Sequence, residues 1–130
     1  RREPQPAIQP DRRVAVWPVD GLSTPRSQTL ERAMEAALRT RGISVAAHDD
    51  PDALVVTAWF TRALETSGER ITVDWVLTRP SGREIGVIQQ NNVLAIGAID
   101  QGWPDVARAI AGAAADGLIE MMALGPIAGS

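Results

Sequence analysis

Residues 71–78 read Ile-Thr-Val-Asp-Trp-Val-Leu-Thr, and this stretch decides the fold class. Large apolar side chains recur at every second position, which is the period of a strand with one buried face: Ile71, Val73, Trp75 and Leu77. Turn-forming residues flank the strand, Ser67-Gly68 before it and Pro80-Ser81-Gly82 after it. The pattern predicts the middle strand of an antiparallel meander.

Two strands are predicted beside this one, over Ala53–Leu64 and from Glu84 towards Val93. The first is rich in Val, Thr, Trp and Phe, and the second begins apolar and then becomes very polar. Towards the N-terminus, Val14–Val19 is a short apolar run typical of a strand buried on both faces, which ends or bulges at Pro18. A further short strand is predicted at Ile43–Ala47, which gives about five strands in all.

Two helices are predicted from apolar residues at three- and four-residue spacing. The first begins with Thr24 as its cap and Pro25 at the first helical position, and it ends at Gly42. The second begins near Trp103-Pro104 after a loop over 94–102, and it ends at Gly125-Pro126. We predict that both bury their apolar stripes, with Leu30, Met34, Leu38, Ile110 and Leu118 in the core.

These elements predict an α+β fold, a two-layer sandwich with two helices on one face of a mixed, about five-stranded sheet. The predicted order is β-α-β-β-β-β, a strand-free loop, and a last α. Residues 1–13 carry Pro4, Pro6 and Pro10 among arginines and are predicted to be a flexible tether. Residues 14–124 form the single domain, and 125–130 form a tail.

The charge and composition exclude several classes of protein. The net charge is −3, and the 13 cationic residues are all arginine and are scattered, which argues against a nucleic-acid partner. The most apolar segment, 106–124, is interrupted by Arg108, Asp116 and Glu120, so no membrane span is expected. The chain has no cysteine, which excludes disulfides and thiolate chemistry and fits an exported protein.

Candidate catalytic residues are few. His48 is the sole histidine and lies beside Asp49, Asp50 and Asp52 in a predicted surface turn. Carboxylates with one imidazole are able to bind a divalent ion, but a hydrated acidic turn explains the same residues. We predict a protein that is not an enzyme and that has no cofactor, metal site or catalytic residue. The alternative is a small soluble enzyme or metal-dependent protein built around His48 and its acidic neighbours.

Candidate partner-binding residues are aromatic or carry amides. Trp17 and Trp75 are expected in the core, Trp103 is expected to close one end of the sandwich, and only one of Trp59 and Phe60 can face the helices. The run 89–92 is either an exposed strand end or a hydrogen-bonding surface for a peptide edge or a sugar. The partner-binding assignment is Trp59, Gln89, Gln90, Asn91, Asn92 and Trp103.

The order of these motifs is similar to that of small periplasmic lipoprotein domains of unknown function from GC-rich proteobacteria. The resemblance covers residues 14–124 and rests on Val14–Gly21, the capped helix, Val73–Leu77, Gln89–Asn92 and the Ala-rich last helix. More loosely, the plan resembles envelope lipoproteins that support lipopolysaccharide export and amino-terminal domains of Tol-type periplasmic proteins.

The resemblance implies an accessory binding role in the periplasm, with an envelope protein or a glycolipid as partner. It implies an outer-membrane anchor only where a lipidated cysteine lies upstream of Arg1, and it is compatible with a homo-oligomer.

Overall fold

The computed structural model describes residues 13–129, with side chains described as far as Ala123. The predicted tether over 1–13 and the tail over 125–130 therefore lie largely outside the described side chains. The elements, in chain order, are β1 (Arg13–Asp20), α1 (Thr24–Thr40), β2 (Ser44–Val45), β3 (Leu54–Glu65), β4 (Gly68–Thr78), β5 (Glu84–Leu94), α2 (Ala98–Gln101) and α3 (Trp103–Gly129).

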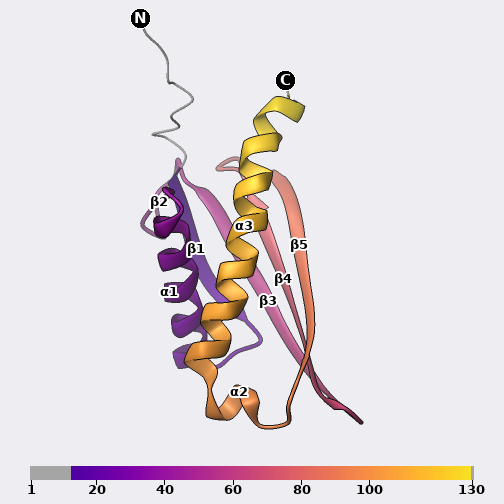
Figure 1. Ribbon diagram of the computed structural model, residues 1–130. Coiled ribbons are helices and arrows are strands. Elements are labelled where there is room, and N and C mark those ends of the chain that lie inside the picture. The colour runs from indigo at the N-terminus through magenta and orange to yellow at the C-terminus, as the bar shows by residue number, and fades with distance from the viewer. Residues whose placement is uncertain (1–12, 130) are drawn as a thin grey trace, which may run out of the picture.

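The strands form one mixed five-stranded sheet in the order β2-β1-β3-β4-β5. β1 is parallel to β2 and β3, whereas β3, β4 and β5 form an antiparallel meander. The helices α1 and α3 lie side by side across one face of this sheet (Figure 1). The predicted α+β sandwich, with two long helices on one face of a mixed sheet, is confirmed.

Local sequence signals set the ends of α1. The cap is Ser23, whose hydroxyl accepts a hydrogen bond from the Arg26 N–H, and not Thr24 as predicted. Thr24 is therefore the first helical residue and Pro25 the second, where the missing N–H of proline still costs no intrahelical bond, because the first four N–H groups of a helix have no partner. At the other end Gly42 has φ +86° and the Ile43 N–H bonds to the Leu38 carbonyl, so the predicted glycine end is confirmed.

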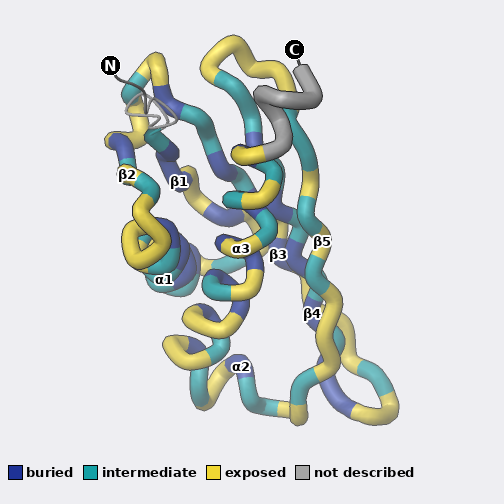
Figure 2. The backbone as a smooth tube through the Cα atoms, turned by 45° about the horizontal axis from the view of Figure 1, so that its top comes forward, coloured by how far each residue is buried: buried dark blue, intermediate teal, exposed yellow. Residues whose placement is uncertain are grey.

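The core lies between the helix pair and the sheet (Figure 2). The five helix residues predicted to be buried are all in it, together with Trp75 at the centre of β4. α3 approaches β5 closely because both elements carry glycine at the contact. A Cβ on Gly117 would lie 2.6 Å from the Ile88 side chain, and one on Gly86 would lie 2.3 Å from Met121 Sδ.

Two segments, the loop before the last helix and the end of that helix, differ from the prediction. The predicted loop over 94–102 contains α2, which gives the chain a third, short helix. The strand predicted from Glu84 towards Val93 is confirmed, since β5 continues through the polar run to Leu94 and β4 offers a partner at each position of that run. α3 continues past Gly125-Pro126, where its end was predicted, to Gly129. Among the described residues, no helix has the length and apolarity that crossing a bilayer requires.

Candidate functional site

The side of the sheet opposite the helices, which we call the open face, carries four of the six exposed large apolar side chains among the described residues. Four large apolar side chains on it are 40–50% exposed: Trp17 at 42%, Trp59 at 48%, Val87 at 50% and Val93 at 40%. They come from β1, β3 and β5, so they extend across the width of the sheet. Exposed apolar groups spread over one solvated sheet face are typical of a contact surface.

Trp17 was predicted to be core, and this prediction is wrong. Val16 pairs with Val56 on the helix side, so strand alternation places Trp17 on the open face, and a bulge at Trp17-Pro18 then returns Val19 to the helix side, where it pairs with Ala58. The indole N–H donates a hydrogen bond to the His48 carbonyl oxygen at 3.1 Å, which holds the ring against the loop between β2 and β3. Pro18 is the sequence signal for this bulge.

Trp59 and Phe60 lie on opposite faces of the sheet, as the alternation of side chains along a strand requires. Phe60 is buried on the helix side, and its ring meets the Trp103 ring edge-on with centroids 5.6 Å apart. Trp59 lies on the open face between two carboxylates, because it pairs with Asp20 on β1 and with Asp74 on β4. An exposed indole flanked by acidic residues is thus a defined feature of the middle of the open face.

The amide side chains of Gln89–Asn92 lie alternately on the two faces of β5. Gln89 lies on the open face, where its amide donates to Asp74 at 2.8 Å, and Asn91 accepts from Arg70. Gln90 lies on the helix side and joins three elements, since it accepts from the Trp75 indole N–H at 2.7 Å and donates to the Ile110 carbonyl at 3.1 Å. Asn92, the remaining member, is exposed.

The structure therefore gives Gln90 a role in holding the sandwich together, and it is not available to a partner in the way that Gln89 and Asn91 are.

Trp103 is 5% exposed and lies under the helix layer. Its indole N–H donates to the Arg26 carbonyl at 3.1 Å, and the Arg26 guanidinium lies 6.0 Å from its ring centroid. The residue closes one end of the sandwich as expected. Its ring is covered by the protein itself, so it does not offer the exposed surface that the partner-binding assignment assumed.

A hollow of about 420 Å³ lies beside Trp17 at one end of the open face. Its walls are largely apolar and include Pro51, Val55 and Pro80. One rim is the acidic turn, where Asp50 accepts two hydrogen bonds from Arg13, at 2.9 and 3.3 Å. These bonds hold the pKa of Asp50 below its usual value. The turn therefore fastens β1 to the loop that precedes β3.

His48 lies near Glu31 on α1, a neighbour that could not be predicted from the sequence. The Nε2 atom of His48 lies 4.0 Å from Glu31 Oε1, beyond hydrogen-bond distance. The other oxygen of Glu31 accepts from the Ser27 hydroxyl at 2.7 Å, and this hydroxyl accepts from the Val19 N–H at 2.8 Å. Ser27 and Glu31 thus satisfy the backbone at the β1 bulge, and the nucleophile-to-histidine contact of a catalytic triad is not formed here.

Among residues 13–129, no group of three or more His, Asp and Glu side chains is arranged to hold a metal ion. The acidic neighbours of His48 do not share one site, because Asp50 pairs with Arg13 while Asp49 and Asp52 are exposed.

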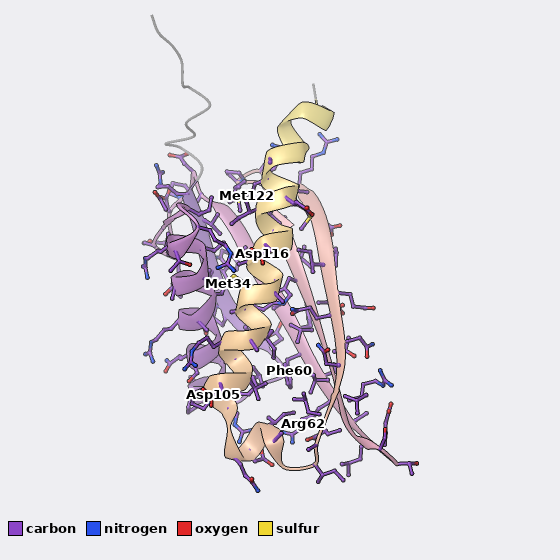
Figure 3. The ribbon with its side chains drawn as sticks, in the orientation of Figure 1. Met34, Phe60, Arg62, Asp105, Asp116 and Met122 are labelled. Atoms are coloured by element: carbon purple, nitrogen blue, oxygen red, sulfur yellow. The ribbon has the colours of Figure 1, made fainter. Side chains whose placement is uncertain are left out.

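Charged residues cluster at the end of the sandwich that holds α2. Arg62 on β3 donates to the buried Glu69 at 2.5 Å and lies 3.7 Å from Asp100, which in turn pairs with Arg26 at 2.9 Å. Figure 3 shows Arg62 at this end of the sheet, below Phe60 and next to the short helix. The Arg26 guanidinium, followed by that of Arg62, holds the pKa of Asp100 below its ordinary value of 3.8. The cluster fastens α2 to both α1 and the meander.

Replacing Asp100 with asparagine should make stability less dependent on acidic pH. Because the folded pKa of Asp100 is lowered, its stabilising effect is complete above the unfolded pKa and is lost as pH falls through the folded pKa. We expect the urea midpoint to fall less for Asp100→Asn than for the wild type between about pH 5 and about pH 2.5. Asp49→Asn, which removes an exposed carboxylate outside this cluster, is the control. An equal fall for Asp100→Asn and the wild type would contradict the prediction.

Comparison with known proteins gives a structural similarity and no sequence family. No protein-family model and no curated protein matches the chain. A solved structure of a PelC dodecamer from Paraburkholderia phytofirmans, carrying one substitution, is similar with a TM-score of 0.56 and 17% identity, over 78% of this chain and 84% of that one. A second PelC dodecamer from the same organism gives a TM-score of 0.54 and 15% identity, over 78% and 82%. At this identity the similarity shows a shared fold.

Proposed function

We propose that this protein is a non-enzymatic assembly module of the cell envelope that works as a homo-oligomer. The observation that carries the proposal is the open face, where Trp17, Trp59, Val87 and Val93 remain 40–50% exposed in the single chain. A stable monomer gains nothing by leaving two indoles on one face, whereas an interface gains from large, rigid aromatic groups near its centre.

The fold comparison supports self-assembly in particular. Both PelC structures with this fold are dodecamers, so the two-layer sandwich is compatible with packing into a large homo-oligomer. The similarity of the sequence pattern to small periplasmic lipoprotein domains supports a place in the envelope. An envelope protein or a glycolipid is then the second partner, and the apolar hollow beside Trp17 is the concave surface available to it.

A binding role rather than catalysis is supported by how the polar side chains are engaged. The Ser27 hydroxyl accepts from the Val19 N–H and donates to Glu31, Asp50 accepts from Arg13, and Gln90 accepts from the Trp75 indole. These groups maintain the fold, and none of them is directed together with His48 at a common point where a substrate atom would react.

The test is the location and the mass of the natural protein. Cells that make it are fractionated, and the protein recovered from the envelope is measured by native mass spectrometry over a range of concentrations. We expect the protein in the envelope fraction, as a multimer with one stoichiometry across that range. Recovery in the cytosol would contradict the location, and a monomer at every concentration would contradict self-assembly.

A further inference from the structure

The outer surface of the helix layer carries a groove between α1 and α3, with a volume of about 470 Å³. Its floor is made of small residues from both helices: Ala33, Ala36, Ala37 and Gly112. Alanine and glycine leave the groove open at a point where longer side chains would close it, so it has room for a large side chain from outside.

Arginine surrounds this groove. Arg32, Arg41 and Arg108 line it, and no acidic residue does. Arg41 pairs with Asp116 at 2.7 Å and Arg108 pairs with Asp105 at 3.0 Å, both on the protein surface. Figure 3 labels these two carboxylates along α3. Arg32 is exposed, and the contacts described for residues 13–129 include no ion pair for it. The groove is therefore an apolar slot bordered by three arginines, of which Arg32 carries the charge that no described ion pair offsets.

The open face carries the complementary arrangement. Trp59 is a large apolar side chain that projects from the middle strand of the sheet, and Asp20 and Asp74 are its neighbours on the adjacent strands. A half-exposed indole between two carboxylates matches, in size and in charge, a small-residue slot bordered by arginines. The complementarity of both properties identifies the occupant as a second copy of this chain.

The two surfaces lie on opposite layers of the sandwich (Figures 1 and 2). One copy is thus able to use its indole on one neighbour and its groove on another at the same time. Such a contact is heterologous, because it joins different surfaces of the two copies, and repeating it builds a ring or a filament rather than a symmetric dimer.

We infer that Trp59 of one copy inserts into the α1–α3 groove of the next, with Asp20 and Asp74 against the arginines of that groove. This inference rests on the proposed self-assembly and names the two surfaces that produce it. The acidic flanks orient the contact, and the buried indole supplies most of its affinity, as aromatic hot spots do in other interfaces.

Two variants of the full chain test the inference, each of which removes one half of the contact. Trp59→Glu removes the indole and leaves the groove, whereas Ala36→Glu places a carboxylate in the groove and leaves the indole. Both positions are exposed, so the fold is expected to survive, which circular dichroism and thermal melting verify. Each variant alone should have a dissociation constant for self-association raised about thirtyfold or more, as loss of a hot spot implies.

The decisive measurement is the mixture of the two variants by native mass spectrometry. Each variant still carries the half that the other has lost, so the mixture should give a complex of two chains, one of each variant, that cannot grow further. The matched controls are Leu64→Glu on β3 and Ala113→Glu on α3, both exposed and outside the proposed contact, and they should assemble like the wild type.

Wild-type assembly with a mixture that stays monomeric would overturn the inference, and so would normal assembly by either variant alone. A wild type that is itself monomeric would contradict the proposed self-assembly, and the inference would fall with it. The first two outcomes leave the proposed function standing, so the failures are distinguishable.

Discussion

Replacing Trp75 with alanine is expected to lower the free energy of unfolding by about 3–5 kcal/mol. The Trp75 side chain is fully buried at the centre of β4, and its removal leaves a cavity in the core cluster between the helices and the sheet. The substitution also removes the indole N–H that donates to Gln90, which leaves the amide oxygen of Gln90 without this donor inside the sandwich.

Urea denaturation measures the loss, and Trp75→Phe separates its two causes. Phenylalanine keeps most of the ring volume but lacks the N–H, so we expect a smaller loss of about 1–3 kcal/mol. A loss below about 1 kcal/mol for Trp75→Ala would show that this residue is not the centre of the core.

Shortening the helix side chains that face the sheet is expected to give the second large loss in the free energy of unfolding. Leu38→Ala on α1 and Ile110→Ala on α3 should each cost about 2–5 kcal/mol, because both side chains lie in the cluster between the helices and the sheet. The control is Arg39→Ala, next to Leu38 but exposed, for which a change within about 0.5 kcal/mol is expected. Losses below about 0.5 kcal/mol at both core positions would refute the placement of the two helices on one face.

The fold was predictable where one periodic signal covered a whole element. The alternation from Ile71 to Leu77 defined β4, and spacing of three and four residues defined α1 and α3. The short helix α2 was missed because a single turn has too few residues to show a period. The end of α3 was misplaced because proline was treated as a stop signal.

The candidate site was harder to predict because its side chains depend on register. Trp17 follows three buried residues of a strand, and it is exposed because the pairing of Val16 with Val56 on the helix side leaves position 17 on the open face. Gln90 was expected among surface amides, but its side of β5 follows from pairing with Val73 on the helix side of β4. The sequence predicted that only one of Trp59 and Phe60 faces the helices. The contact between Phe60 and Trp103 in the core shows that it is Phe60. Asp20, Val87 and Val93 join the open face only through the sheet order.

The parallel pairing of β1 with β3 has a consequence for the order in which the chain folds. The meander β3-β4-β5 is contiguous in sequence and closes through two short turns, so its contacts form at little cost in loop entropy. Val14, in contrast, pairs with Leu54, about 40 residues later, and β1 must enter between β2 and β3. During synthesis from the N-terminus, we therefore expect the first strand of this sheet to wait for its main partner and to be among the last strands completed.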